Sequence, residues 1–583
     1  MSKSTSGKVT KKPYKENQGY LIPPSENKSK PPKSHVRLSG KGISDKITYK
    51  PYEQDQMYLI PPSVEELIPP DHLVRLVSET IDEMKLQPLL EQQLRDIAAK
   101  KRPKKGKKSG IGGGASRYNP VMMTKLFVYG YMTKVCSSRM LAKAARENVM
   151  YMWLSGGQKP DFRTLNDFRG KLLKGVMEEI FVTAVKMLAA KGYVKLENYF
   201  VDGTKMESAS GRYTYVWKKT VEKNDKKLDE KLREYVRLAE KIWEEEDQEY
   251  GDRDLEELGG KEGYTSADVK ELAGVLKERL ERLADEENKK KLRSSLKTIQ
   301  KDVLPRKKKY EKAKRTLGNR NSYSKTDPDA TFMRMKEDHN GKGQPKPGYN
   351  VQIGTENGFV IGYDLFPNPS DTKTLKPHLR RQKQRLGVKP KVVIADAGYG
   401  SEENYRYLEN RRTVAVVKYP GYRKEAAKKW QEDQWVTEHW EYNKDGNYYI
   451  CPEKRKLISK GNIEKQTYSG FPIKAHRYEC ESCKYCRKRK QCTKSKGNRV
   501  IEVNEKWLRL KNKAKRTLHD ERYVELRKQR SVEVETVFGQ IKANQRYRRF
   551  LLRGTAKVST EWGLLSLGYN LKQMYRLNRD KTA

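Results

Sequence analysis

Three acidic residues far apart in the chain stand where carboxylates can hold metal ions. Asp202 ends the apolar segment NYFVD, and Asp396 ends the apolar segment KVVIAD. Glu535 lies at the edge of an apolar stripe that starts at Val534 and recurs at i, i+3, i+4 and i+7, the spacing of a helix. Two aspartates at the ends of adjacent strands, faced by a glutamate from a packed helix, can converge on one point. We therefore expect these three carboxylates to share a site.

Such a site suits hard divalent ions. Mg²⁺ prefers oxygen ligands and keeps several waters, so a few carboxylates on rigid elements suffice to hold it. In two-metal sites, one ion activates the nucleophile and the other stabilises the leaving oxygen of an in-line displacement at a phosphodiester. We expect Mg²⁺, or Mn²⁺, at Asp202, Asp396 and Glu535. The alternative for each aspartate alone is a turn former, and Asp364, also at a strand end, competes for the second position.

A cluster of cysteines forms a second candidate metal site. Five of the six cysteines lie between residues 451 and 492. The pair Cys483-x2-Cys486 puts two thiolates on one tight turn, as tetrahedral Zn²⁺ prefers. Four ligands are needed and five thiols are present, so the spacing leaves open which four bind; a group of free thiols is the alternative. Cys136, alone on a helical segment, is most simply a small buried residue.

The charge of the chain points to a polyanionic partner. The formal net charge is +48, and the basic residues are spread along the chain. Basic residues bind nucleic acid by releasing condensed counterions from phosphates. A ribosome-associated protein, a merely basic protein and a binder of acidic membranes are the alternatives. Because no run of about 18 apolar residues occurs, we expect no membrane span and a cytoplasmic, nucleoid-associated protein.

The predicted elements place the carboxylates in a known order. A strand ending at Asp202 is followed by a hairpin around Asn357-Gly358 and by a strand ending at Asp396. A helix, a further strand and a late helix with Glu535 come next. This order is typical of an α/β, ribonuclease-H-like catalytic core, in which a mixed sheet is flanked by helices.

Composition and hydrophobic periodicity divide the chain into segments. The expected segments are a basic disordered arm (1–48), an N-terminal helix with a flexible basic linker (49–116), an all-α, helix-turn-helix-like DNA-binding domain (117–192), a catalytic core in three pieces (193–216, 317–420 and 501–583), an inserted charged helical hairpin (217–316) and an inserted Cys-rich, zinc-ribbon-like module (421–500).

Several basic residues are candidate DNA contacts. Arg139, Lys143, Arg163 and Arg169 fall on the predicted exposed turns of short helices, which fits a helix-turn-helix-like reader. A plain helical bundle with solvated charges is the alternative. Lys542 lies seven residues after Glu535, about two helical turns away on the same side, where it could approach a phosphate near the metals.

Read together, these segments resemble the transposases of bacterial insertion sequences. The resemblance is to the eleven-eighty-two group within the superfamily that also holds the insertion-sequence four and five types, and it runs from about residue 50 to 575. The segments that carry it are YNPVMMTKLFVYGYM, SSRMLAKAARENVMYMWLSGG, PDFRTLNDFR, FVDGTKMES, KTDPDATFMRMK, GYNVQIG, VIADAGYGSEENY and SVEVETVFGQIKANQRYRRFLLRG.

The resemblance implies roles for particular residues. It makes Asp202, Asp396 and Glu535 the catalytic triad, with Lys542 at the family's Glu-six-residues-Lys spacing. The zinc ligands it implies are Cys451, Cys483, Cys486 and Cys492, which leaves Cys480 as the extra thiol. The superfamily often has an Arg four residues before the Glu; here Ser531 stands there and Arg530 is one place off, a candidate DNA contact together with Arg548 and Arg549. Asp327, Asp329 and Asp371 lie in recognisable segments without an assigned role and are interpreted as turn and cap residues.

The function implied by the resemblance is DNA transposition. Such an enzyme binds the terminal inverted repeats of its own element, hydrolyses DNA to free a 3′-hydroxyl and joins that hydroxyl to target DNA. A homodimer on double-stranded DNA is expected, because two element ends must be handled together. A metal-dependent nuclease that does not join strands, and a DNA-binding protein that has lost catalysis, are the alternatives.

Overall fold

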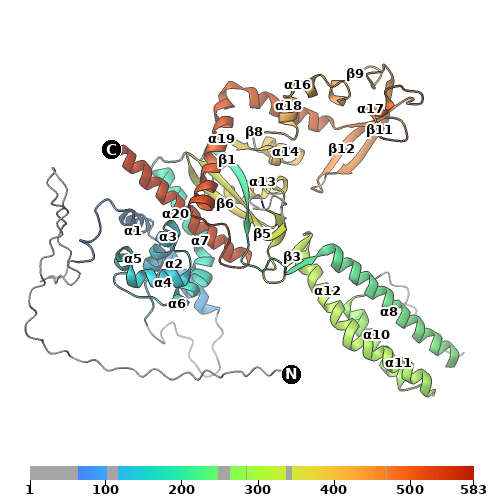
Figure 1. Ribbon diagram of the computed structural model, residues 1–583, viewed down its shortest axis with the longest axis horizontal. Helices are drawn as coiled ribbons and strands as arrows, with labels where there is room; N and C mark the ends of the chain where they lie inside the picture. The colour runs from blue at the N-terminus through green and yellow to red at the C-terminus, as the bar shows by residue number, and fades with distance from the viewer. Residues whose placement is uncertain are drawn as a thin grey trace, which may run out of the picture. The chain divides into compact units, whose positions relative to one another are not determined.

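The computed structural model of the protein describes residues 63–100, 116–246, 263–283, 285–335, 345–467 and 469–582 (Figure 1). The predicted basic arm and nearly all of the glycine-rich linker lie outside the described residues. No helix in the part of the chain that the structure describes is long and apolar enough to cross a membrane.

A mixed sheet carries the predicted aspartates. Its strands are β1 (Asn198–Glu207), β4 (Thr331–Arg334), β5 (Pro345–Glu356), β6 (Phe359–Phe366), β7 (Val392–Ala395) and β8 (Val414–Val417). The order is β4-β5-β1-β7-β8, and β6 pairs with β5. The β5–β6 hairpin turns at Asn357 and Gly358, which both have a positive φ, as the Asn-Gly pair predicts. β1 pairs antiparallel with β5 and parallel with β7, so the sheet is mixed.

Helices cover both faces of this sheet. They are α13 (Leu375–Leu386), α14 (Glu402–Asn410), α18 (Glu505–His519), α19 (Glu521–Gly539), the π-helix η6 (Gln540–Asn544) and α20 (Thr555–Thr582), with the short 3-10 turns η3 (Asp371–Lys373) and η4 (Ala397–Tyr399) between strands and helices. α19 packs on β1, β5 and β7, whereas α13 and α20 pack on β6. A mixed sheet between helices fits the ribonuclease-H-like core expected from the order of elements.

The helices of the N-terminal segment share their core with the sheet. They are α1 (Leu73–Glu83), α2 (Gln87–Ala99), α3 (Pro120–Met132), α4 (Ser138–Glu147), α5 (Val149–Leu154), α6 (Phe162–Asp167), the π-helix η1 (Phe168–Leu173) and α7 (Lys174–Ala190). Asn119 caps α3, with Pro120 in its first turn, and Ser137 caps α4. α20 packs on α3 and α7, and one continuous apolar cluster joins these helices to the sheet. The helical segment is therefore not packed as a separate unit.

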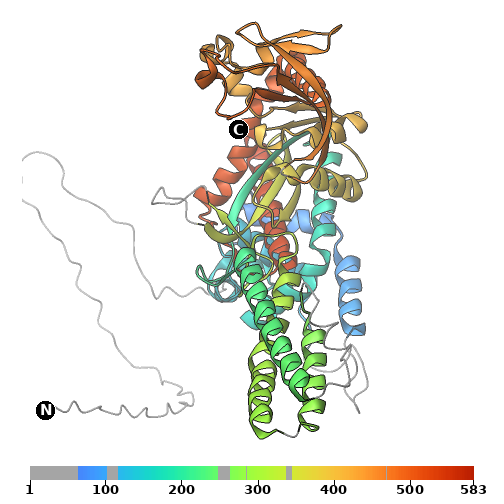
Figure 2. The same ribbon diagram turned by 90° about the vertical axis from the view of Figure 1, so that its right-hand side faces the viewer.

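The charged insertion holds more helices than the predicted hairpin. Its elements are α8 (Lys218–Glu246), α10 (Ser266–Leu280), α11 (Glu286–Thr298), the π-helix η2 (Ile299–Val303) and α12 (Leu304–Leu317), which lie side by side (Figures 1 and 2). After α10 the chain begins a new helix, α11, which Asp285 caps and which packs against α10. A leucine-rich core of its own stabilises the insertion, and the paired strands β2 (Tyr215–Trp217) and β3 (Ser322–Ser324) connect it to the rest of the chain.

The cysteine-bearing insertion is built on a second sheet. The strands are β9 (Glu441–Asn443), β10 (Tyr448–Ile450), β11 (Lys456–Gln466), β12 (Pro472–Cys480) and β13 (Val500–Val503), in the order β13-β12-β11-β10-β9. Short helical turns flank them: α15 (Tyr422–Glu425), α16 (Lys428–Gln431), the 3-10 turn η5 (Thr437–His439) and α17 (Arg489–Cys492).

Candidate active site

Two of the three predicted carboxylates lie at neighbouring positions of the sheet. In the parallel register of β1 and β7, Phe200 pairs with Ile394, and Asp202 and Asp396 each follow two residues later. The apolar residues of β7 before Asp396 are all buried, so the strand enters the core and delivers Asp396 at its end. Asp396 accepts a hydrogen bond from the backbone N–H of Gly398 (2.9 Å) and thereby caps η4. Both aspartates are partly exposed.

The pKa of a buried tyrosine, Tyr399, is raised by its burial and by the charges of both aspartates and of a third carboxylate. The hydroxyl of Tyr399 donates a hydrogen bond to Oε1 of Gln352 (2.5 Å). Burial raises the pKa of Tyr399 well above its ordinary value, and the negative charges of Asp371, Asp202 and Asp396 raise it further. The charges of all three carboxylates therefore act on one tyrosine of the core.

Asp371 was interpreted from the sequence only as a turn or cap residue. In the structure its Oδ1 accepts hydrogen bonds from Nδ2 of Asn350 (2.8 Å) and Nε2 of Gln352 (2.9 Å), both on β5. Its segment stands between β6 and α13, far from the two predicted aspartates in sequence. Only the tertiary packing of η3 against η4 reveals its position; the sequence signal was limited to a recognisable segment without an assigned role.

Basic side chains lie close to the aspartates. Nη1 of Arg530 is 3.6 Å from Oδ2 of Asp202, so this candidate DNA contact stands at the acidic site itself. Burial lowers the pKa of Lys418, at the end of β8, and the positive charges of Arg530, Arg423 and Arg527 lower it further. From the sequence, Arg530 is a candidate DNA contact, but Lys418, Arg423 and Arg527 are not singled out.

Lys542 lies near the strand that carries Asp202. It belongs to η6, and its Nζ donates to the backbone oxygen of Lys205 in β1 (3.2 Å). Lys542 thus contacts β1, and its approach to a DNA phosphate near the metals stays a prediction.

Glu535 lies on the expected helix, α19, but within the described residues it makes no hydrogen bond or ion pair with Asp202 or Asp396. α19 packs on the strands that carry them, and Val534, Val537 and Phe538 form its buried stripe. Glu535 is exposed and makes no hydrogen bond or ion pair within the described part of the chain. No three His, Cys, Asp or Glu side chains among the described residues lie close enough together to hold one metal ion. The convergence of all three predicted carboxylates therefore stays a prediction.

Two other carboxylates have structural partners. Glu533 accepts a hydrogen bond from the backbone N–H of Gly358 at the hairpin turn (2.8 Å). Asp364, the competing second position, lies buried under α13, where it contacts Nδ1 of His378 (2.7 Å) and Nη1 of Arg385 (3.1 Å). Burial raises the pKa of Asp364, but the hydrogen bond from His378 and the arginine charges outweigh it and lower that pKa below its ordinary value. Asp364 is therefore already neutralised by partners in the core.

The five clustered cysteines line one small cavity of about 20 Å³. The lining thiols are those of Cys451, Cys480, Cys483, Cys486 and Cys492. Burial raises the pKa of Cys480 to about 12 and also raises the pKa of Cys492. Within the described residues no three of these thiols are placed to hold one ion, so the structure does not support the predicted structural zinc.

One predicted DNA contact is wrong in this structure. Arg169 is only 3% exposed, and its Nη1 donates to the hydroxyl of Tyr131 (2.8 Å) and the backbone oxygen of Cys136 (2.8 Å). The carboxylate of Glu561 in α20 lies 3.8 Å from the same nitrogen. Arg169 therefore joins η1 to α3 and α20 inside the core and does not reach the surface.

The other predicted contacts are on the surface. Arg139 and Arg163 are exposed, place their guanidinium groups over the ring of Phe162, and line a 560 Å³ cavity. Lys143 is exposed and pairs with Glu147 at 3.5 Å.

The two remaining arginines lie close to the end of β1. Arg549 donates to the backbone oxygens of Ser208 (3.0 Å) and Ser210 (2.7 Å), which anchors it beyond that strand. Arg548 is exposed beside it.

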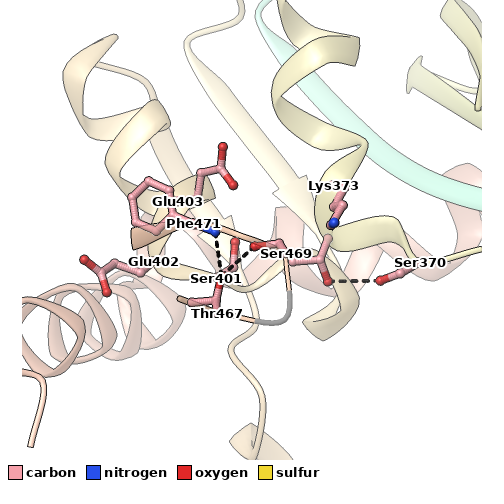
Figure 3. A pocket seen from close by; sticks show the side chains of 9 residues that line it. Ser370, Lys373, Ser401, Glu402, Glu403, Thr467, Ser469 and Phe471 are labelled. Carbon is pink, nitrogen blue, oxygen red and sulfur yellow. Dashed lines mark hydrogen bonds between the residues drawn. The ribbon is translucent and has the colours of Figure 1, made fainter. Parts of the chain in front are cut away.

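A separate cavity of about 130 Å³ lies between the loops that follow β6 and β7 and the cysteine-bearing insertion. Figure 3 shows its lining, to which η3 and α14 contribute on one side and the β11–β12 turn on the other. The lining residues are Ser370, Thr372, Lys373, Ser401, Glu402, Glu403, Thr467, Ser469 and Phe471. None of the predicted site residues lines it, so it adjoins the carboxylate site without being part of it.

Comparison with known families agrees with the predicted chemistry. A family model described as "Transposase DDE domain" matches residues 450–575, which include α19 and Glu535. A second, described as "Transposase domain (DUF772)", matches residues 62–171, which include α1 to α6. No curated protein matches the chain. The two matches, together with the mixed sheet that carries the aspartates, indicate a metal-dependent DDE-type transposase of the insertion-sequence four and five type.

Proposed function

We propose that the protein binds the terminal inverted repeats of its own insertion sequence, cleaves DNA there and joins the freed 3′-hydroxyl ends to target DNA. It would be a member of the eleven-eighty-two group. The observation that carries the proposal is the parallel register of β1 and β7, in which Asp202 and Asp396 each follow two residues after the paired Phe200 and Ile394, on strands against which α19 packs.

The site residues are Asp202, Asp396 and Glu535. The two aspartates offer partly exposed, hard oxygen ligands, which suit Mg²⁺ or Mn²⁺. Glu535 supplies the third carboxylate from α19, where it has no other partner within the described residues and can turn toward the strands. Bound ions would supply activation of the attacking oxygen and stabilisation of the leaving oxygen.

The basic residues beside this site would hold the DNA backbone. Arg530 and Lys418 lie next to the aspartates, and Lys542 lies along β1. A phosphodiester placed among them would be held by charge and oriented for attack. Arg139 and Arg163, on the surface of the helical segment, would bind the repeats, and a homodimer would bring two element ends together.

Purified full-length protein tests the proposal with labelled duplexes that carry the inverted repeats, Mg²⁺ and a target plasmid. Joined products support it. Nicks without joining would point to a nuclease, and shifted but uncut DNA would point to a DNA-binding protein without catalysis.

Single substitutions test the residues. D202A, D396A and E535A are each expected to lower cleavage by at least about 10²–10³-fold, the range seen when a group that stabilises a transition state is lost. DNA binding should persist in all three. E525A is the matched control, because Glu525 is an exposed glutamate of the same helix that pairs with Lys528. Full activity in D396A, with loss in D364A, would overturn the assignment of Asp396.

A further inference from the structure

Asp371 occupies a position that the proposed triad does not explain. It begins η3, directly before α13, and its Oδ1 is fixed by the amides of Asn350 and Gln352. Oε1 of Gln352 in turn accepts a hydrogen bond from the hydroxyl of Tyr399, whose pKa is raised by burial and by the charges of Asp202 and Asp396. One hydrogen-bonded chain therefore connects Asp371 to the core beneath both aspartates.

Two glycines show how closely Asp371 approaches the predicted pair. A Cβ atom at Gly203, the residue after Asp202, would stand 2.7 Å from Oδ1 of Asp371. A Cβ atom at Gly398 would stand 3.1 Å from Oδ1 of Asp396 and 3.8 Å from Oδ2 of Asp371. The carboxylate of Asp371 thus lies between the backbone next to Asp202 and the turn next to Asp396.

The turn that carries Asp371 is tied to the turn that carries Asp396. Oγ1 of Thr372 donates to the backbone oxygen of Gly398 (3.0 Å). Nδ2 of Asn404, at the start of α14, donates to the backbone oxygens of Thr372 (3.0 Å) and Tyr399 (2.8 Å). These bonds hold η3, which begins with Asp371, against η4, which follows Asp396.

Among the residues that the structure describes, the side chain of Asp371 has uncharged partners. The groups that donate hydrogen bonds to its carboxylate are neutral amides, and within the described chain no Lys or Arg forms an ion pair with it. Arg530 is paired with Asp202. Neighbouring carboxylates repel one another, and a nearby cation relieves that cost.

We propose that Asp371 supplies a further negative charge to the divalent-ion site of Asp202 and Asp396, an inference that rests on the proposed function. Direct contact with the ion is not required, since Mg²⁺ keeps several of its waters and a carboxylate can act on them. Asn350 and Gln352 are positioning residues in this arrangement, because they orient the carboxylate through Oδ1.

Binding of Mn²⁺ to the full-length protein without DNA tests this role, with free Mn²⁺ followed by electron paramagnetic resonance. D371N keeps the shape and one acceptor oxygen but removes the charge. It is expected to weaken Mn²⁺ binding by about 10- to 100-fold, the usual cost of losing an outer partner of a metal site, with an unchanged melting temperature. E403Q is the matched control: Glu403 lies on the neighbouring α14 and pairs with Lys376, and its loss should leave Mn²⁺ affinity unchanged.

D371E separates charge from shape. It restores the charge with a longer side chain, so its Mn²⁺ affinity should lie well above that of D371N. If Mn²⁺ binding were weakened equally in both variants, Asp371 would have a structural role and the inference would be overturned. Wild-type affinity in D371N, alongside lost binding in D202N, would overturn the role of Asp371 and leave the proposed site standing. A wild-type protein that binds no Mn²⁺, or a D202N variant that binds as well as wild type, would remove the proposed site and this inference together.

Discussion

Gly203 shows how closely the residues around the proposed active site are packed. The position follows Asp202 on β1 and pairs with Gln352 on β5. A side chain there would collide with the amide of Gln352 and the carboxylate of Asp371. The absence of a Cβ at this one position is what allows a third carboxylate to approach the strand that carries Asp202.

We expect G203A to disturb the site through this collision. Overpacking of a tight environment costs about 1–3 kcal/mol, so the free energy of unfolding should fall by that amount, and cleavage should fall as Asp371 and Gln352 are displaced. Urea unfolding and a cleavage assay measure the two effects. G274A is the control: a Cβ at Gly274, within α10, meets nothing within 4 Å, and helix propensity favours alanine by about 0.5–1 kcal/mol. An unchanged G203A protein would contradict the close approach.

Residues whose role follows from local pattern could be predicted from the sequence, and residues whose role depends on distant packing could not. The Asn357-Gly358 turn and the stripe starting at Val534 are local patterns, and both are present. No local pattern marks Asp371. Its partners Asn350 and Gln352 belong to β5, which precedes it in the chain, and η4, against which its turn packs, comes later. The prediction that Arg169 contacts DNA is wrong for the same reason: its acidic neighbour, Glu561, lies in α20, far away in the sequence.

At the scale of elements, α20 joins the helical segment to the sheet. Glu561 accepts hydrogen bonds from the backbone N–H groups of Leu551 and Leu552 (both 3.0 Å) and from the hydroxyl of Tyr131 (3.2 Å). Burial raises the pKa of Glu561, and the positive charge of Arg169 counteracts that rise. One buried cluster therefore connects α3, η1 and α20.

Removing Arg169 should weaken this junction and leave the DNA surface intact. R169M would leave Glu561 buried without its cation, and breaking a buried pair in this way costs about 3–5 kcal/mol. Denaturant unfolding should show that loss. R163M is the control, since Arg163 is exposed and its removal should change stability by no more than about 0.5 kcal/mol. If R163M destabilised the protein more than R169M, the structural role given to Arg169 would be wrong.

The larger elements differ from expectation where the chain folds back on itself. Periodicity predicted two charged helices between residues 217 and 316, but α11 and α12 return alongside α8 and α10. The buried residues give the reason: apolar side chains of α8, α10, α11 and η2 share one leucine-rich core, so the apolar faces of the added helices are buried there as well. A sequence shows the stripes but not how many helices are needed to cover them.

At the scale of the whole molecule, the net charge of +48 should make DNA binding strongly dependent on salt. A general excess of charge would act over the whole surface, whereas a binding surface would depend on particular residues. Arg139 and Arg163 are the sharpest test, because both are exposed on the helical segment and lie over one aromatic ring.

The double variant R139Q/R163Q should make the dependence of binding on salt less steep. If each arginine neutralises one phosphate, the slope of log Kobs against log salt should become less negative by roughly 1.8, since each contact contributes about 0.9. Fluorescence anisotropy of a labelled duplex, titrated at several salt concentrations, measures the slope. K308Q/K309Q removes the same charge from exposed positions of α12, in the charged insertion, and should leave the slope near that of wild type. Equal slopes for the two double variants would mean that the helical segment contributes only to the overall charge and is not a DNA-binding surface.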